Sequence, residues 1–231
     1  DRYTERLMNA LQKELRLDRQ PRHIECFDNS NLQGAHPVAS CVVFRDGKPA
    51  RKDYRHFNIK TVEGPDDYAS MREVVFRRYS RLQEEGAELP DLIIADGGKG
   101  QMGVIHEVLE YLGLDIPVAG LAKNDRHRTS ELLCGFPPVL VGIRPTSPLF
   151  HFLAHIQEEV HRFAVSFHRQ KRSKAFIHSE LEQIEGIGDK TVRTLLQHFR
   201  TVAKVKAAPF EELTALVGPA KAKKIKAFFE K

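Results

Sequence analysis

A continuous apolar run of four residues, Leu-Ile-Ile-Ala at 92–95, constrains the fold of this chain more than any other segment. The run has the length of a strand, and Gly97-Gly98 ends it shortly afterwards. A strand without polar alternation is buried on both faces, which is typical of a central position in a parallel sheet. We therefore expect a sheet that carries helices on both of its faces.

The segments around this run alternate between strand and helix patterns. Three strands near the N-terminus have the order of an antiparallel meander, and the later segments alternate in type. These patterns predict an α/β fold in which helices flank a mixed sheet. The expected strands lie at 23–28, 38–44, about 50–59, 92–95 and 117–122, and the expected helices at 1–17, 67–82, 101–113 and from Ser147 to about Lys171.

The last third of the chain differs in character from the rest. Charged residues crowd the stretch 168–179, and the sequence beyond it has four short helical pieces and no strand pattern. We therefore expect two domains, the first at 1–172 and a small helical domain at 177–231.

Two copies of a short pattern, offset by thirty residues, lie in this small domain. Gly186 and Gly188 precede a helix in the first copy, and Gly218 precedes one in the second. Glycines permit a tight turn, and the N–H groups at the start of the next helix attract a phosphate, so the pattern resembles a helix-hairpin-helix. A plain turn between helices remains the alternative, above all for the second copy, which has lost one glycine and gained Pro219. The lysines that would add charge there without reading base sequence are Lys190, Lys221 and Lys223.

Two aspartates stand where predicted strands end. Asp28 ends the first strand and Asp96 follows the apolar run. If these strands are parallel neighbours, both carboxylates emerge at one edge of the sheet and need a cation, for which Mg²⁺ or Mn²⁺ is suited. The alternative is that such residues only form turns, as an Asp before Gly commonly does. The sequence DGGKGQ lacks the spacing of a phosphate-binding loop, which disfavours a nucleoside triphosphate site.

Composition limits the classes of function. Lys plus Arg exceed Asp plus Glu by 36 to 31, a net charge of +5 that permits nucleic-acid binding without requiring it. No apolar run approaches about 20 residues and no signal peptide opens the chain, so no contact with a membrane is expected. Three scattered cysteines fit neither a disulfide framework nor a CxxC zinc site, and they indicate a reducing, cytoplasmic location.

Several segments together closely resemble the C-terminal half of the UvrC family, the incision subunits of the bacterial nucleotide excision repair excinuclease. They are IECFDNSNLQG, GPDDYASMREVVFRRY, LIIADGGKGQ, GLAKN and EEVHRFAVSFHRQKRSK, and EGIGDKTVRTLLQHF resembles the helix-hairpin-helix pair of the family. The resemblance runs in order over essentially the whole chain. It implies an RNase H-like fold for the first domain and a tandem helix-hairpin-helix fold for the second.

The resemblance also implies a catalytic site. Asp28, Asp96 and His161 take the positions of an Asp-Asp-His set that binds metal, although a histidine on a helix flank is more commonly packed or solvated. A further carboxylate falls at Asp67, with Asp66 as the alternative, and we expect one of the two to cap the helix that follows. Basic residues beside these motifs would either hold phosphates or stay solvated, and they are Lys99, Lys123 and Arg162.

The implied function is a divalent-metal-dependent DNA endonuclease that makes the incision on the 5′ side of a lesion, with Mg²⁺ or Mn²⁺ as cofactor. The expected partners are double-stranded DNA with a lesion or bubble, and UvrB. The family's N-terminal half, absent here, would provide the main contact with UvrB and the nuclease for the 3′ incision. The chain is expected to be monomeric. Two alternatives stay open: another RNase H-like nuclease, such as a junction resolvase or a ribonuclease H, and a non-catalytic DNA-binding adaptor.

Overall fold

The computed structural model describes residues 1–30, 38–62, 66–123 and 130–230. The description is limited to the backbone for Ser30, Lys123, Ser130 and 168–179. The chain divides into two compact units, Asp1–Val165 and Ser166–Lys231, and each has a hydrophobic core of its own.

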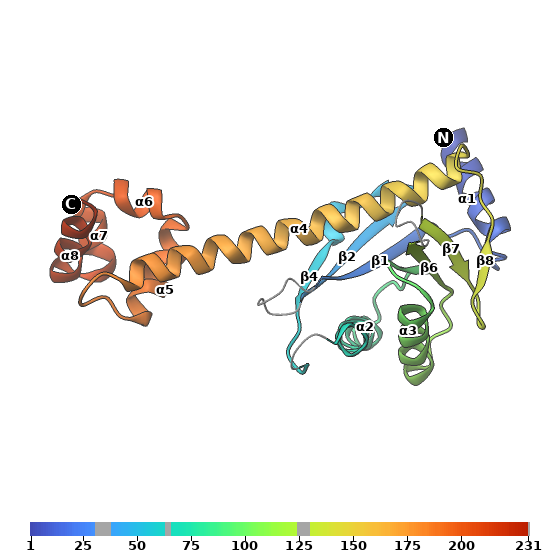
Figure 1. The fold of residues 1–231 in the computed structure, drawn as a ribbon, viewed down its shortest axis with the longest axis horizontal. Helices are drawn as coiled ribbons and strands as arrows, with labels where there is room; N and C mark the ends of the chain where they lie inside the picture. The colour runs from blue at the N-terminus through green and yellow to red at the C-terminus, as the bar shows by residue number, and fades with distance from the viewer. Residues whose placement is uncertain (31–37, 63–65, 124–129, 231) are drawn as a thin grey trace. The chain divides into compact units, whose positions relative to one another are not determined.

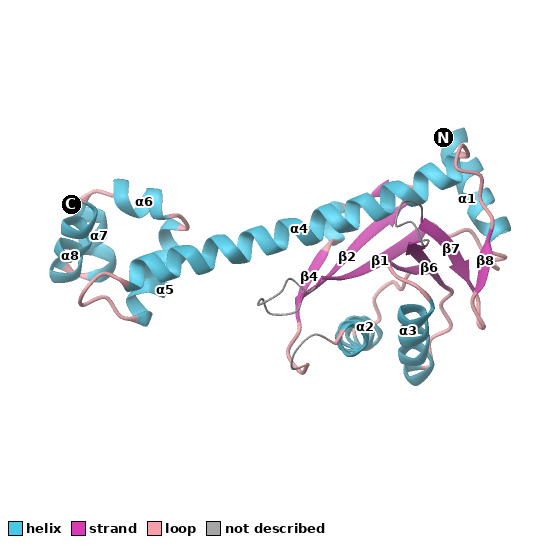
Figure 2. Cartoon of the chain, viewed as in Figure 1, coloured by secondary structure: helices cyan, strands magenta, loops and turns pink. Residues whose placement is uncertain are grey.

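The first unit is built on one mixed sheet (Figures 1 and 2). Its strands, within the described residues, are β1 (His23–Ser30), β2 (Val38–Arg45), β3 (Lys48–Pro49), β4 (Arg55–Asn58), β5 (Leu92–Ala95), β6 (Val118–Lys123), β7 (Ser130–Cys134) and β8 (Val139–Val141). The order across the sheet is β3-β2-β1-β5-β6-β7-β8, and β4 also pairs with β2. β5 runs parallel to both of its neighbours, β1 and β6, whereas the remaining pairs are antiparallel.

Helices cover both faces of this sheet, as expected for the α/β class. They are α1 (Arg2–Glu14), α2 (Asp67–Glu84), α3 (Lys99–Leu112) and α4 (Pro148–Glu182), and a short 3₁₀ helix η1 spans Arg51–Asp53. α2 and α3 lie side by side on one face, and the first part of α4 crosses the opposite face (Figure 1). The predicted mixed sheet flanked by helices is therefore confirmed.

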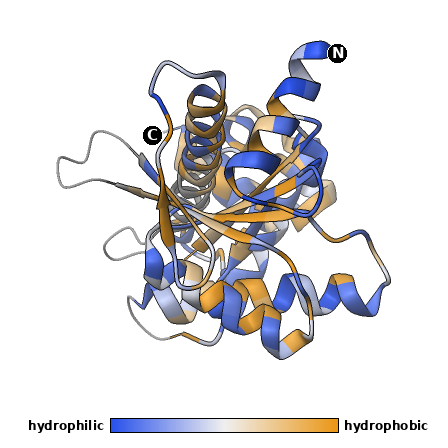
Figure 3. Cartoon of the chain, turned by 90° about the vertical axis from the view of Figure 1, so that its right-hand side faces the viewer, coloured by the Kyte–Doolittle hydropathy of each residue, from blue (hydrophilic) through white to orange (hydrophobic). Residues whose placement is uncertain are grey.

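The apolar run at 92–95 has the central position that its sequence predicts. All four residues of β5 are buried, and the strand has a parallel neighbour on each side. The central strands are predominantly hydrophobic in Figure 3. The core beneath α4 includes Leu153, Ile156 and Val160, which share one stripe of that helix.

The predicted strand at about 50–59 is wrong as a single element. Its place is taken by β3, η1 and β4, and both strands pair with β2. The backbone N–H of Ala50 still donates to the carbonyl oxygen of Val43 at 2.8 Å, and the turn of η1 then interrupts the pairing until β4 begins. β7 and β8 were not expected, since β8 is only three residues long and lies at the sheet edge without apolar alternation.

α4 continues well beyond the predicted end near Lys171 and includes the charged stretch 168–179. Charge alone does not end a helix, and the sequence from Leu149 to Glu185 contains neither proline nor glycine. The boundary between the two compact units along the chain therefore falls within α4. The domain limits 1–172 and 177–231 remain a prediction.

The second unit contains four helices after the end of α4, in agreement with the four expected helical pieces. They are α5 (Asp189–Phe199), α6 (Val202–Ala207), α7 (Phe210–Val217) and α8 (Pro219–Phe229). Its core is centred on fully buried residues that include Val192 and Ala222, the two positions in register between the repeat copies. None of the helices in the described part of the chain is both long and apolar enough to cross a lipid bilayer.

Candidate metal centre

Asp28 and Asp96 lie near the carboxyl ends of two neighbouring parallel strands. β1 continues for two residues past Asp28, so the expectation that Asp28 ends its strand is wrong by two residues. The register of β1 against β5 pairs Phe27 with Ala95, so the next residue on each strand is an aspartate. The backbone N–H of Asp96 donates to the carbonyl oxygen of Phe27 at 2.9 Å, which continues this pairing past the end of β5. Parallel strands in register orient equivalent side chains to the same face, so the two carboxylates emerge together.

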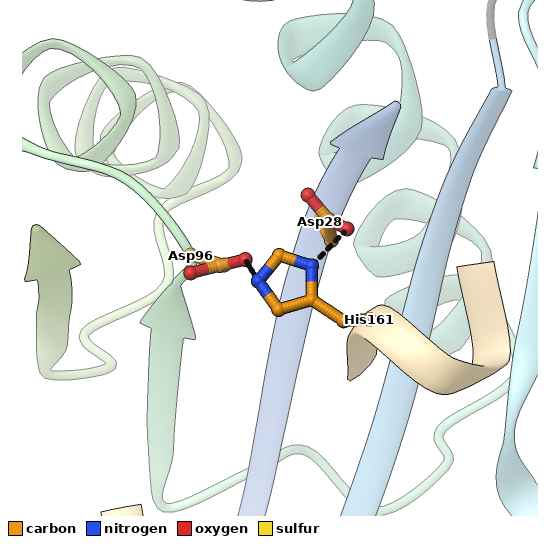
Figure 4. A group of neighbouring side chains, drawn as sticks. All are labelled: Asp28, Asp96 and His161. Atoms are coloured by element: carbon orange, nitrogen blue, oxygen red, sulfur yellow. Dashed lines mark ion pairs between the residues drawn. The ribbon is translucent and has the colours of Figure 1, made fainter. Parts of the chain in front are cut away.

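His161 reaches this pair of carboxylates from α4 (Figure 4). Its Nδ1 lies 3.4 Å from Oδ2 of Asp28, and its Nε2 lies 3.0 Å from Oδ2 of Asp96. One ligand atom from each of the three residues falls within 4.8 Å of the others. No other cluster of three metal-ligating side chains was found in the ranges that the structure describes.

The donor set of this cluster fits a divalent cation. The side chains of Asp28 and Asp96 are only 10% and 6% exposed, whereas His161 is 45% exposed and leaves one side of the cluster open to solvent. A neutral imidazole has a single N–H, so one of its two nitrogens presents a lone pair to a carboxylate oxygen. A cation shared by that nitrogen and both carboxylates relieves the repulsion, and oxygen ligands favour Mg²⁺ or Mn²⁺ while imidazole favours the softer Mn²⁺.

The thiol of Cys26 is affected by the negative charges of Asp28 and Asp96. It precedes Asp28 by two residues on β1 and is fully buried. Burial raises the pKa of the Cys26 thiol well above its usual range, and the charges of Asp96 and Asp28 raise it further. The thiol therefore stays protonated and is neither a metal ligand nor a nucleophile at neutral pH.

Gln157 contacts the cluster, although our sequence analysis did not select it. Its Nε2 donates a hydrogen bond to Oδ1 of Asp96 at 2.9 Å. Gln157 lies one helical turn before His161, so both side chains contact the same carboxylate from one face of α4. That spacing of four residues was the available signal, because any ligand on a helix shares its face with the residue four positions earlier.

The predicted phosphate contact Arg162 has a partner inside the protein. Its Nε and Nη2 donate to Oε1 and Oε2 of Glu159 at 2.9 and 3.0 Å, and the hydroxyl of Tyr54 donates to Glu159 at 2.8 Å. The hydrogen bond from Arg162 is the main reason that the pKa of Glu159 falls to about 2. These contacts tie α4 to the segment before β4, and a role of Arg162 in phosphate binding remains a prediction.

The two adjacent aspartates at the start of α2 have different roles in the fold. Asp66 caps the helix, since its side chain accepts a hydrogen bond from the N–H of Ala69 at 3.0 Å. The carbonyl oxygen of Asp67 accepts a hydrogen bond from Nδ2 of Asn29 at 2.6 Å, which links α2 to β1 beside Asp28. The expectation that one of the two caps the helix is confirmed, but Asp67 is outside the three-residue cluster and its catalytic role remains a prediction.

The remaining basic candidates near the cluster lie on α3 and β6. Lys99 is the first residue of α3 and is exposed, three residues after Asp96. Lys123 ends β6, and its side chain lies outside the described residues. Both assignments as phosphate contacts remain predictions.

The two repeat copies in the second unit form turns that require glycine. Gly186 and Gly218 have φ values of +84° and +91°, a region that other residues rarely adopt. Gly188 is the N-cap of α5 and Gly218 is the N-cap of α8. Pro219 is the first residue of α8 and lacks an N–H, so the second helix start has one fewer donor for an anion.

The lysines of these two copies are exposed and differ in their contacts. Nζ of Lys221 donates to Oγ1 of Thr191 at 2.8 Å, which connects the second copy to the first. Lys190 and Lys223 are also exposed, as the second residue of α5 and the fifth residue of α8. Their assignment to DNA binding remains a prediction.

The mixed sheet, the two carboxylates at the ends of adjacent parallel strands and the helix that crosses above them define an α/β domain of the RNase H-like class. Residues 12–165 match the family model described as the UvrC RNAse H endonuclease domain, and residues 179–231 match the SAM-like helix-hairpin-helix tandem. The chain therefore belongs to the UvrC RNase H endonuclease domain family, and its C-terminal part is a helix-hairpin-helix tandem.

Similar proteins are known from several bacteria. The chain is 60% identical over 221 residues to UvrABC system protein C of Bacteroides fragilis, and 51% identical over 232 residues to that of Flavobacterium johnsoniae. These matches cover 96% and 100% of this chain but 36% and 38% of the relatives, so the chain spans little more than a third of their length. A structure of Endonuclease V from Ciona intestinalis in complex with a 24mer DNA has a TM-score of 0.35 and 16% identity, covering 53% of this chain and 56% of that one.

Proposed function

We propose that this chain is a divalent-metal-dependent DNA endonuclease that hydrolyses one phosphodiester bond on the 5′ side of a lesion during nucleotide excision repair. The observation that carries the proposal is the convergence of Asp28, Asp96 and His161 within 4.8 Å on a domain of the UvrC endonuclease family. Two carboxylates this close repel each other. Bringing them together therefore costs free energy unless a cation or a substrate compensates their charge.

Each residue of the cluster has a defined task in this proposal. Asp28 and Asp96 provide oxygen ligands, and His161 provides one ring nitrogen. A bound Mg²⁺ or Mn²⁺ supplies an activated water and neutralises charge on the scissile phosphate and on the leaving oxygen. Gln157 fixes the orientation of the Asp96 carboxylate, and the exposed side of His161 leaves the opening through which a DNA strand approaches.

DNA binding away from the cluster is assigned to the second unit. Its two turns place glycines at the starts of α5 and α8, where N–H groups attract backbone phosphates, and exposed lysines add positive charge. The partners we assign are double-stranded DNA with a lesion or bubble, and UvrB. We place the contact with UvrB in the part of the relatives that this chain does not match, and we expect one copy of the chain to act at each incision.

A nicking assay tests the proposal. Supercoiled plasmid carrying lesions is incubated with the chain in Mn²⁺, in Mg²⁺ and in excess chelator, and conversion to the open circle is measured. We expect nicking with metal, none with chelator and none with Asp96→Asn. Plasmid binding without nicking in either metal would support the adaptor alternative instead.

A comparison of substrates tests the remaining alternative, which is another RNase H-like nuclease. A duplex with an unpaired bubble, a four-way junction and an RNA–DNA hybrid of the same sequence are compared as substrates. Faster cleavage of the bubble duplex supports an excision nuclease, whereas faster cleavage of the junction or the hybrid supports a resolvase or a ribonuclease H.

A further inference from the structure

A groove of about 440 Å³ lies beside the metal centre, between α4 and the β6–β8 side of the sheet. Its walls are mostly apolar and include Leu121, Leu132, Leu140, Phe150 and Ala154. The volume falls within the range of about 300–1,000 Å³ that is typical of sites for small organic groups.

The groove is continuous with the metal centre along one row of residues across the sheet. β5 and β6 pair Ala95 with Gly120, so Leu121 is the neighbour of Asp96 on the same face. The row continues from Leu121 to Leu132 on β7 and from Leu132 to Val141 on β8. Gln157 lines the groove and donates to Asp96, so a single side chain contacts both places.

The described polar residues of the groove favour a hydrogen-bond donor over an anion. Among the residues that the structure describes, the polar side chains in the lining are Glu131, Gln157 and Glu158, and no described lysine or arginine is part of it. Carboxylates repel a phosphate but accept hydrogen bonds from the amino groups of cytosine, adenine and guanine. Half-buried Phe150 adds an aromatic ring, and stacking on such rings is the usual way in which proteins hold single bases.

We propose that this groove receives the base of a nucleotide next to the scissile phosphate. The inference rests on the proposed endonuclease function, because it needs a DNA strand that passes over the metal centre. A base can enter the groove only after it leaves the duplex stack, and this costs least where the strand is unpaired or damaged. The groove therefore makes cleavage favour a strand that is locally opened.

Fluorescence of a base analogue tests the groove directly. 2-Aminopurine is placed at one position at a time on both sides of the scissile bond in a bubble duplex. The duplex is bound by the Asp96→Asn chain with Mn²⁺, so that binding is observed without cleavage. We expect the emission to change strongly at one position, and replacement of that nucleotide by an abasic site to weaken binding about tenfold.

Variants that fill the groove provide the critical comparison. Ala154→Phe, combined with Asp96→Asn, adds a ring to the groove wall and should abolish both the emission change and the effect of the abasic site. Ala87→Phe is the matched control, because Ala87 is exposed and precedes the start of β5, at the opposite end of that strand from Asp96. If Ala154→Phe lowers the thermal stability, Leu140→Ser is used instead, since Leu140 is 56% exposed on the edge strand.

The outcomes distinguish the groove from the endonuclease function. The proposal is overturned if the emission changes equally at every position, or if the change persists in Ala154→Phe. A segment of protein would then be the expected occupant of the groove. A position-specific response in a chain whose unmodified form does not nick plasmid with Mn²⁺ supports the groove and contradicts the endonuclease function.

Discussion

Gln157 donates its side-chain N–H to Oδ1 of Asp96 at 2.9 Å, and this leaves Oδ2 of the same carboxylate directed at His161. One oxygen of Asp96 therefore accepts a hydrogen bond from Gln157, which orients the carboxylate, and the other oxygen faces His161. A carboxylate on an isolated strand end can rotate about its terminal torsion, which is broad. The amide on α4 removes that freedom and couples the position of the helix to the geometry of the metal centre.

The first prediction concerns this orienting contact. Gln157→Leu retains the approximate size of the side chain but removes the hydrogen bond, so we expect the apparent affinity for Mn²⁺ to fall about 10- to 100-fold. The measurement is nicking rate against Mn²⁺ concentration. Saturating Mn²⁺ should restore most of the rate, whereas a loss that no concentration of Mn²⁺ restores would show that Gln157 contributes to the reaction itself.

The second prediction concerns Asp96 as a ligand. Asp96→Asn removes the charge and almost no volume, so the fold and the affinity for DNA should persist while nicking falls at least about 100-fold. Nicking and thermal unfolding are measured for this variant and for Asp115→Asn, whose aspartate is exposed on a different surface. Near-normal nicking by Asp96→Asn would remove this residue from the site.

The third prediction concerns a buried carboxylate on the other face of the sheet. Glu25 accepts hydrogen bonds from Arg78 at 2.7 and 2.9 Å and from the hydroxyl of Tyr79 at 2.7 Å, and it contacts His23 at 2.7 Å. Burial alone would raise its pKa, but the bonds from His23 and Arg78 outweigh burial and lower the pKa to about 2. The carboxylate therefore holds α2 against β1 as an ion.

The sign of the pH dependence follows from that pKa. Because the folded pKa lies below the ordinary value of 4.5, Glu25 stabilises the fold fully above about pH 4.5, and this contribution of order 3 kcal/mol disappears as the pH falls towards 2. Glu25→Gln leaves Arg78 buried without its counterion and should cost about 3–5 kcal/mol at pH 7. The difference in the free energy of unfolding between Glu25→Gln and wild type should become smaller as the pH falls from about 4.5 towards 2.

Tyrosine fluorescence in urea gives the measurement. The chain has no tryptophan, and its five tyrosines, at positions 3, 54, 68, 79 and 111, all lie in the first unit, so the signal reports on that unit alone. Glu84→Gln, at an exposed position on α2, makes the same change of charge and should cost little. If the difference in the free energy of unfolding between Glu25→Gln and wild type stays constant from pH 7 to pH 2, the ionised Glu25 carboxylate does not stabilise the fold as proposed.

The sequence predicts the metal centre better than it predicts the surroundings of that centre. The apolar run before Asp96 fixes a buried parallel strand, and the register of that strand places Asp28 beside it. The signal for Gln157 is weaker, because its spacing of four residues before His161 gains meaning only once the helix is placed over a carboxylate. The groove beside the centre also needed the structure, since β8 is too short and too exposed to carry a strand pattern.

The extent of α4 illustrates the opposite error. A charged stretch at 168–179 suggests a boundary, yet arginine, lysine, glutamine and alanine all favour helix, and no glycine or proline lies between Pro148 and Gly186. A helix continues until a glycine or a proline interrupts it, whereas the division into compact units depends on long-range contacts. A local pattern cannot report those contacts.

The fourth prediction concerns the two helix-hairpin-helix copies. If Lys190 and Lys223 each neutralise one phosphate, replacing either with Gln should lower the slope of log affinity against log salt by about 0.9. Because Pro219 removes a donor N–H, we expect the first copy to contribute more affinity than the second. Binding of the bubble duplex is measured at several salt concentrations, with Lys48→Gln in the first unit as control, and unchanged slopes for both lysines would mean that DNA is held elsewhere.

The fifth prediction distinguishes His161 as a ligand from His161 as a packed residue. Protons and metal compete for the imidazole nitrogen, so at limiting Mn²⁺ the nicking rate should fall as the medium is acidified from about pH 8 to about pH 5.5. Excess Mn²⁺ should move this fall to lower pH. His161→Asp replaces the neutral imidazole with an anionic ligand that loses its proton at much lower pH, so the variant should be slower but should retain its relative rate on acidification. His161→Ala should be nearly inactive throughout, and an Ala variant with a normal rate and reduced thermal stability would identify His161 as a packing residue.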